Sequence, residues 1–304
     1  MQRTSIMRAI SALAFAVSAS LSSVASAEPN SFVAPTDWSR GQARSTYQEW
    51  DVFSSPTMDT PNLPDVGYYN PNAPDGAGLN VYDATQFAWV VGSGNLYSPF
   101  ATIDVQATVP GYGLGSWYHT IVVAQTQTYG SELDYANITV NGTHAASTTE
   151  LSRVESTVEF TSEPVYIVGA SSVWRLNGNE FNYTFSFPAV GPSSSFDRVA
   201  IDMYAVLNGD VNGDQVVDIQ DITKIANNWL QTGSTGDANG DGIVDIQDIT
   251  FVANNWLHSA ANAPPAQLPT QNLPVPEPAT WALLFSGMAA LGVLVRRRGA
   301  VDLG

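Results

Sequence analysis

Residues 209–223 read GDVNGDQVVDIQDIT and residues 236–250 read GDANGDGIVDIQDIT, so one unit occurs twice at a spacing of 27 residues. Both copies continue into the same five residues, ANNWL, at 226–230 and 253–257. An internal duplication of this kind predicts two equivalent structural units that cover each other's apolar surface.

Each copy carries oxygen-bearing side chains at positions one, three, five, nine and twelve of a twelve-residue loop. They are Asp210, Asn212, Asp214, Asp218 and Asp221, then Asp237, Asn239, Asp241, Asp245 and Asp248. Calcium takes roughly six to eight oxygen ligands, and this spacing delivers them when position seven adds its backbone carbonyl. Those carbonyls belong to Val216 and Ile243. The sequence therefore predicts two calcium ions, whose binding drives local folding because the acidic side chains otherwise repel one another.

The residues that follow each loop have helical periodicity. The apolar stripe is Ile219, Ile222, Ile225, Ala226, Trp229 and Leu230 in the first copy, and Ile246, Ile249, Val252, Ala253, Trp256 and Leu257 in the second. We expect the two helices to bury these stripes against each other. No helix is expected before the first loop, because residues 200–207 alternate apolar and polar side chains like a strand.

A loop and an exiting helix, present twice without an entering helix, resemble a type I dockerin over residues 207–258. The resemblance implies that the side chains and carbonyls above are calcium ligands, with Asp closing each loop. One departure is Gln215, which replaces the usual glycine at loop position six, whereas Gly242 keeps it. The first loop either accepts a positive φ at a glutamine or adjusts locally, and we expect its site to be the weaker one.

The resemblance also implies a cohesin-like protein partner. Cellulosomal dockerins present small hydroxyl residues to that partner at loop positions ten and eleven. This chain has Ile219 and Gln220 there in the first copy, and Ile246 and Gln247 in the second. These four residues are the candidate partner-binding positions, although they depart from the familiar recognition pair.

The region from residue 28 to residue 206 has the pattern of a β domain. Runs rich in Val, Ile, Thr and aromatic residues lie between Gly, Pro, Asn and Ser clusters, at 47–53, 86–91, 101–109, 118–128, 135–140, 165–176, 181–187 and 196–206. Several runs alternate with a period of two, which indicates antiparallel strands with distinct faces. The expected fold is mainly β: an antiparallel β-sandwich, jelly-roll-like, over 28–206, followed by the small α-helical dockerin-like domain.

No motif in this β region selects a reaction centre. Carboxylates suited to glycoside hydrolysis are Glu132, Asp134, Glu150, Glu155, Glu159, Glu163 and Glu180, and the pattern pairs no two of them. Aromatic residues suited to stacking on a sugar are Tyr68, Tyr69, Trp117, Tyr118 and Trp174, with core packing as the competing interpretation for each. The leading hypothesis is a non-catalytic protein whose sandwich binds carbohydrate or protein. The alternative is a secreted polysaccharide-degrading glycoside hydrolase, docked onto a multienzyme complex.

The C-terminal region has three parts in order. They are the tetrapeptide Val275, Pro276, Glu277 and Pro278, the uncharged apolar stretch 279–295, and the cluster Arg296, Arg297 and Arg298. An apolar stretch of about this length spans a bilayer as a helix, and the arginines favour its cytoplasmic side. The order resembles a PEP-CTERM sorting tail, here 275–304, which implies processing by an exosortase-type enzyme. The competing interpretation is a membrane anchor that is never cut.

The remaining features place the protein outside the cytoplasm. Residues 1–27 have the basic start, apolar stretch and Ala-Ser-Ala end of a signal peptide, and residues 259–274, with four prolines and no charge, read as a linker. The chain has 304 residues, 28 acidic and 11 basic, with a net charge of −17 and no cysteine. This balance excludes a nucleic-acid partner. We expect export to the cell surface or extracellular matrix, with at least transient membrane anchoring.

Overall fold

The computed structural model describes residues 32–68, 76–83, 87–156, 164–233 and 235–264. The expected signal peptide (1–27) and sorting tail (275–304), including the expected membrane helix 279–295, lie outside these residues. Among the residues that are described, no helix is both long enough and apolar enough to cross a bilayer.

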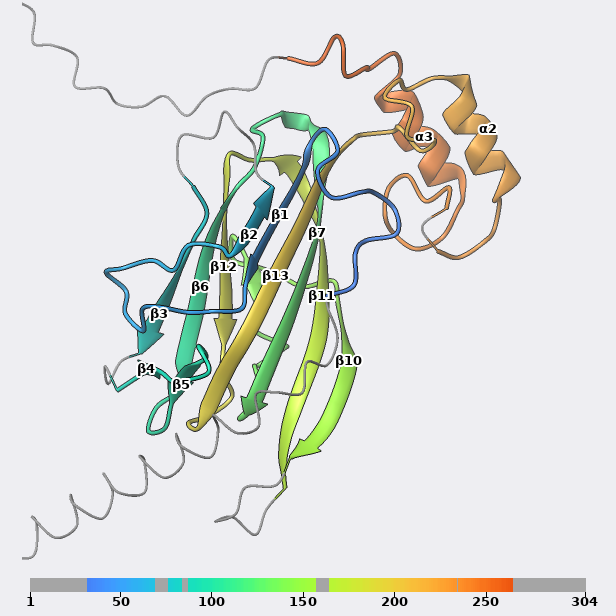
Figure 1. Ribbon diagram of the computed structural model, residues 1–304. Coiled ribbons are helices and arrows are strands. Elements are labelled where there is room, and N and C mark those ends of the chain that lie inside the picture. The colour runs from blue at the N-terminus through green and yellow to red at the C-terminus, as the bar shows by residue number, and fades with distance from the viewer. Residues whose placement is uncertain (1–31, 69–75, 84–86, 157–163, 234, 265–304) are drawn as a thin grey trace, which may run out of the picture. The chain divides into compact units, whose positions relative to one another are not determined.

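Two antiparallel sheets make up the β domain (Figure 1). The larger sheet has the order β10-β11-β7-β13-β1-β2, and β4 joins it through β5, which pairs with β13. Its strands are β1 (Ser45–Trp50), β2 (Val66–Tyr68), β4 (Trp89–Val90), β5 (Leu96–Ser98), β7 (Gly115–Gly130), β10 (Ser147–Ser156), β11 (Val165–Asn179) and β13 (Ser194–Leu207). The smaller sheet has the order β3-β6-β12-β8-β9. Its strands are β3 (Gly78–Asp83), β6 (Ile103–Pro110), β8 (Thr139–Val140), β9 (Thr143–His144) and β12 (Asn182–Pro188).

The hydrophobic core lies between the two sheets, because alternate residues of their strands point toward each other. Trp174 of β11 meets Phe185 of β12 edge-on, with ring centroids 6.2 Å apart, and Phe187 of β12 lies 6.1 Å from Phe196 of β13. All four side chains are buried. The prediction of a mainly β, antiparallel sandwich followed by two short helices is therefore confirmed. Trp174 belongs to this core and is unavailable to stack on a sugar.

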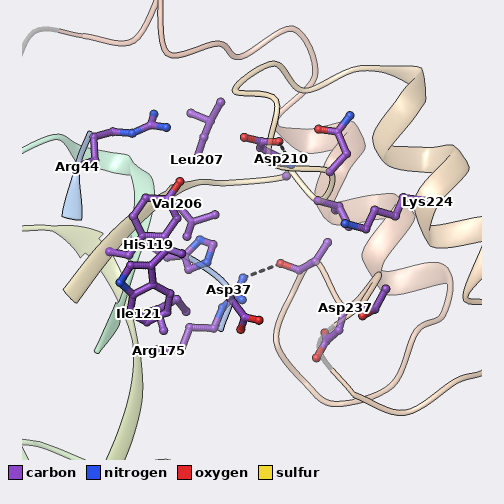
Figure 2. Close-up of a pocket in the computed structure, with 18 of the residues that line it drawn as sticks. Asp37, Arg44, His119, Ile121, Arg175, Val206, Leu207, Asp210, Lys224 and Asp237 are labelled. Carbon is purple, nitrogen blue, oxygen red and sulfur yellow. Dashed lines mark hydrogen bonds between the residues drawn. The ribbon is translucent and has the colours of Figure 1, made fainter. Parts of the chain in front are cut away.

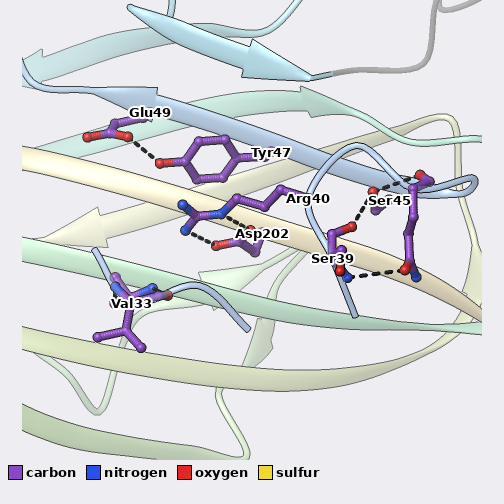
Figure 3. Close-up of polar contacts among 9 residues, drawn as sticks. Val33, Ser39, Arg40, Ser45, Tyr47, Glu49 and Asp202 are labelled. Carbon is purple, nitrogen blue, oxygen red and sulfur yellow. Dashed lines mark hydrogen bonds and ion pairs between the residues drawn. The ribbon is translucent and has the colours of Figure 1, made fainter. Parts of the chain in front are cut away.

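Residues 32–44, which we call the N-terminal strap, run along the outer face of the larger sheet (Figure 3). Arg40 donates two hydrogen bonds of 2.8 Å to Asp202 of β13 and lies over the ring of Tyr47. Asp202 is fully buried, and burial raises its pKa although Arg40 opposes the shift. The strap therefore covers the outer face of the larger sheet around Asp202, and Arg40 supplies the charge that this buried carboxylate needs.

Candidate calcium loops

The two repeats form twelve-residue loops, 210–221 and 237–248, which lead into α2 (Ile219–Asn227) and α3 (Ile246–Asn254). In each loop the first aspartate gathers backbone amides of its own loop. Asp210 accepts hydrogen bonds from the amides at positions four and six, both at 2.8 Å. Asp237 accepts from the same two positions at 2.7 and 2.9 Å. The duplicated sequence therefore gives duplicated geometry.

The aspartates at position twelve, Asp221 and Asp248, are fully buried. Asp221 accepts hydrogen bonds from the amides at positions two, three and nine, at 2.7, 3.0 and 2.8 Å. Asp248 accepts from positions three and nine, at 3.1 and 2.7 Å. Position nine, Asp218 or Asp245, is the N-cap residue of the following helix and completes a capping box with position twelve. The carboxylates at positions nine and twelve thus have two roles, since they close the loop and cap the N-terminus of the helix that follows.

Positions three and five complete the pattern. Asn212 accepts from the amide at position five at 2.8 Å, and Asp214 accepts from the amide at position seven at 2.9 Å. The second copy, with Asn239 and Asp241, repeats these contacts at 2.9 and 3.0 Å. All ten predicted side chains therefore lie on two loops with matching hydrogen-bond patterns.

The loops differ at position six. Gln215 has a φ of 74°, in the left-handed region, and Gly242 has a φ of 91°. Of the two outcomes open for the glutamine, the first loop takes the strained one. A side chain in this region costs on the order of 1 kcal/mol that glycine avoids.

The one described cation whose charge acts on second-loop carboxylates is Arg175 of β11, which faces Asp237 and Asp248 electrostatically without forming an ion pair. Burial raises the pKa values of Asp210 and Asp221, with their own loop's carboxylates adding to the shift. Across the described residues, no Lys or Arg forms an ion pair with a loop aspartate. No three His, Cys, Asp or Glu side chains in the described part of the chain are grouped closely enough to hold a metal ion. An all-oxygen donor set with buried, uncompensated carboxylates nevertheless fits a hard cation, since amide and carbonyl oxygens supply the remaining ligands.

Each loop pairs with the chain that follows the helix of the other copy. Leu257, after α3, donates to the carbonyl of Val217 at 3.0 Å, and Leu230, after α2, donates to the carbonyl of Val244 at 2.9 Å. Both pairings continue further along the chain: Ala260 donates to the carbonyl of Gln215 in the first loop, and Gly233 donates to the carbonyl of Gly242 in the second. Residues 259–264, expected to belong to the linker, therefore include a segment fixed to the first loop. The repeat ends later than its sequence pattern indicates.

The dockerin-like region is packed onto the β domain. Tyr118, Ala205 and Leu207 of the larger sheet share one buried apolar cluster with residues of both repeats, among them Val217 and Val244. This burial places Tyr118 in a core, so it cannot be part of an exposed sugar platform.

Polar and aromatic contacts reinforce this junction. Arg175 of β11 donates to the carbonyl of Ala238 in the second loop at 2.6 Å. Gly240 has a φ of 83°, which favours glycine, and a Cβ at this position would lie 2.6 Å from the Arg175 side chain and displace it. Trp117 stacks on His258 with ring centroids 3.7 Å apart, which covers one ring face of this sugar-platform candidate. The side chain of Tyr68 and all of Tyr69 lie outside the description.

The two helices bury less of their apolar stripes than expected. Ile225 and Val252 are fully buried, whereas the ends of each stripe are exposed. The exposed members are Ile219, Ala226, Trp229 and Leu230 in the first copy and Ile246, Ala253, Trp256 and Leu257 in the second. The prediction that the stripes bury each other is therefore wrong at both ends of each helix. Gln220 and Gln247 are exposed as well.

Two of the candidate catalytic carboxylates are already engaged. Arg153 donates to Glu132 at 2.8 Å and to Glu150 at 2.7 Å at the edge of the larger sheet. Glu159 and Glu163 lie outside the described residues. Residues that sequence reasoning missed are Arg175, which donates a hydrogen bond to the second loop, and Arg44 of the N-terminal strap, which lies over the ring of Tyr118. No local pattern marks them, because only the fold brings them there.

Comparison with protein families gives two matches. Residues 208–255 match the dockerin type I domain, and residues 274–298 match the PEP-CTERM protein-sorting motif. No curated protein and no solved structure matches the chain. Type I dockerin domains typically bind calcium, and they imply a cohesin partner, while the sorting motif implies processing by an exosortase. The chain thus carries a β-rich N-terminal body, a type I dockerin domain and a PEP-CTERM sorting motif, as an exported cell-surface protein does.

Proposed function

We propose that this is a non-catalytic surface protein whose dockerin domain binds two calcium ions and thereby holds a protein partner. The observation that carries the proposal is the matching closure of two oxygen-rich loops around buried aspartates that form no ion pair within the described residues. The proposed ligands are Asp210, Asn212, Asp214, Val216, Asp218 and Asp221, and Asp237, Asn239, Asp241, Ile243, Asp245 and Asp248. Bound calcium supplies the positive charge that these carboxylates lack.

The exposed apolar ends of the helices support two equivalent partner surfaces. Leu257 is hydrogen-bonded to Val217, two residues before Ile219, and Leu230 is hydrogen-bonded in the same way two residues before Ile246. Each surface thus combines an isoleucine of one copy with a leucine of the other. The isoleucines are 62% and 61% exposed and the leucines 66% and 72%. Both leucines have a φ of 61°, a strained conformation that persists in both copies.

We assign these surfaces to a cohesin-type partner, with Gln220 and Gln247 beside the isoleucines. Exposed apolar residues in a polar surround are typical of protein interfaces. An apolar position ten, in place of a small hydroxyl residue, predicts a partner whose facing surface is apolar at that point.

The sandwich is the part that the protein displays. Its strand order, with β1 beside β13 and β13 beside β7, supports a jelly-roll-like arrangement that presents a carbohydrate- or protein-binding surface. The engagement of Glu132 and Glu150 by Arg153 supports a non-catalytic role for these two carboxylates. Export through a cleaved signal peptide, transient anchoring by 279–295 and exosortase processing complete the proposal.

Calorimetric titration with purified type I cohesin modules tests the partner assignment. We expect binding in calcium and none in chelator. Ile219→Glu and Ile246→Glu should each leave one surface and reduce affinity by only a few fold, whereas the double variant should lose about 100-fold or more. Val190→Glu, at an exposed apolar position of the sandwich, is the control. If the double variant bound cohesin with the wild-type affinity, the two surfaces would not be the partner-binding sites.

A further inference from the structure

A cavity of about 680 Å³ lies beside the junction of the β domain and the dockerin domain (Figure 2). The N-terminal strap, the ends of β7, β11 and β13, and residues of both loops line it. This volume is within the range of pockets that hold small ligands. Its position is separate from the exposed helix ends proposed above as partner surfaces.

Half of the basic residues of the chain between the two sorting segments line this one cavity. From 28 to 278 the chain has 27 acidic and six basic residues, the latter being Arg40, Arg44, Arg153, Arg175, Arg198 and Lys224. Arg40 and Arg153 are held in ion pairs, and Arg198 donates to Gln127. The other three line the cavity, and none of them forms an ion pair with an acidic residue in the described part of the chain.

Arg44 is the most unusual of the three cations. Its backbone has a φ of 67°, and its carbonyl is fixed by a hydrogen bond from Ala205. The Nε and Nη1 atoms of its guanidinium are buried without a hydrogen-bond partner, as is the Nε1 atom of neighbouring Trp38. Buried donors without acceptors cost free energy, and a strained backbone at such a residue points to a role in binding.

Three aspartates also line the cavity, and the charge of one of them, Asp237, acts on Arg175 without an ion pair between the two. Asp210 and Asp237 accept hydrogen bonds from amides of their own loops, and Asp37 forms no ion pair within the described residues. The cavity also has an aromatic side, where Trp38 stacks on Tyr204 with ring centroids 5.7 Å apart. Cations, an aromatic face and neutral polar groups together suit a sugar that carries a negative charge.

We propose that this cavity binds an anionic saccharide, with its carboxylate or sulfate group at Arg44 and with Lys224 and Arg175 adding charge from the dockerin helix and from β11. Carboxylate and sulfate share the oxyanion chemistry that a guanidinium recognises. The proposal goes beyond attachment through the dockerin domain, because it gives the junction a ligand of its own.

Calorimetric titration of the full chain in calcium tests this proposal with four probes. They are D-galacturonate, N-acetylglucosamine 6-sulfate, neutral D-galactose and a triglutamate peptide. We expect one or both anionic sugars to bind, with the tighter one identifying the oxyanion, and galactose and the peptide to bind at least about tenfold more weakly. Binding of neither anionic sugar, or equal binding of galactose or of the peptide, would overturn the assignment.

Variants locate the site. Arg44→Gln should lower the affinity for the anionic sugar by about tenfold or more, and Lys224→Gln, on a different element, by a few fold. Arg153→Gln removes the same charge at the sheet edge, outside the cavity, and should change nothing. Arg44→Gln should also keep wild-type calcium binding, which separates loss of the sugar site from loss of the loops. An Arg44→Gln protein that binds calcium and the sugar as the wild type does would contradict the proposal.

Discussion

The two calcium loops have nearly the same sequence but different surroundings. Both close around the first and twelfth aspartates in the same way. Both are also covered by the chain that follows the helix of the other copy, at residues 257–260 for the first loop and 230–233 for the second. The first loop carries a strained Gln215, whereas the second lies against Arg175 of β11 and keeps Gly242. The repeated sequence therefore determines the hydrogen bonds within each loop, and the fold determines which residues of the β domain contact it. Differences between the loops should follow from these neighbours.

Removing the buried carboxylate at position twelve should have the largest effect. Asp221→Ala and Asp248→Ala each leave buried amides without an acceptor, so we expect each to lower the free energy of unfolding by about 3 kcal/mol or more. Asp221→Ala should cost more, because it serves three amides and Asp248 serves two. Urea unfolding in calcium, followed by circular dichroism, measures this. Gln220→Ala is the exposed control, and equal losses in control and variants would refute the closure of the loops.

The second largest effect should come from acidification, which should lower the free energy of unfolding through His119 of β7. Burial, with Arg175 nearby, lowers the pKa of His119 from 6.5 to about 4. Between pH 6.5 and about pH 4, the unfolded chain binds a proton at His119 and the folded chain does not. The stability that neutral His119 contributes is therefore fully present above pH 6.5 and is lost as the pH falls toward 4. The loss reaches about 3 kcal/mol. His119→Gln should flatten this part of the stability curve in urea titrations. A variant with the wild-type slope would exclude His119 as the cause.

Removing the contact between Arg175 and the second loop should lower the free energy of unfolding by a smaller amount and should affect the second loop alone. Arg175→Met removes the hydrogen bond to the Ala238 carbonyl, and we expect a loss of about 1 to 2 kcal/mol. In nuclear magnetic resonance spectra the amide of Gly240 should shift, whereas that of Gly213, at the same position of the first loop, should not. Equal shifts of both would mean that the β domain does not distinguish the loops.

Exchanging the residues at position six of the two loops should give the smallest change in the free energy of unfolding, with opposite signs in the two variants. Gln215→Gly relieves the left-handed glutamine and should stabilise the first loop by about 1 kcal/mol, while Gly242→Gln should destabilise the second by a similar amount. Thermal unfolding in calcium compares the two variants. Changes of the same sign would show that backbone strain at this position does not set the difference.

Local sequence predicted what depends on local chemistry. Helical periodicity predicted the helices that the structure places at 219–227 and 246–254, and each of the eight runs expected from alternation overlaps a strand, while the calcium ligands stay a prediction. Strand β10 was not expected, because its Ser, Thr and Glu side chains lie on an exposed edge with no apolar face to bury.

What depends on distant contacts did not follow from the sequence. The stacking of Trp117 on His258 and the approach of Arg175 to the second loop join residues far apart in the chain. The exposed ends of the helix stripes were mispredicted for the same reason, since helical periodicity reports which residues share a face and not how far the neighbouring element extends.

Calcium titration of the full chain by calorimetry decides whether the two loops are metal sites. We expect two ions per chain for the wild type, and one for either Asp221→Ala or Asp248→Ala. An absence of heat, or a stoichiometry that neither substitution alters, would contradict the assignment of the two loops as metal sites.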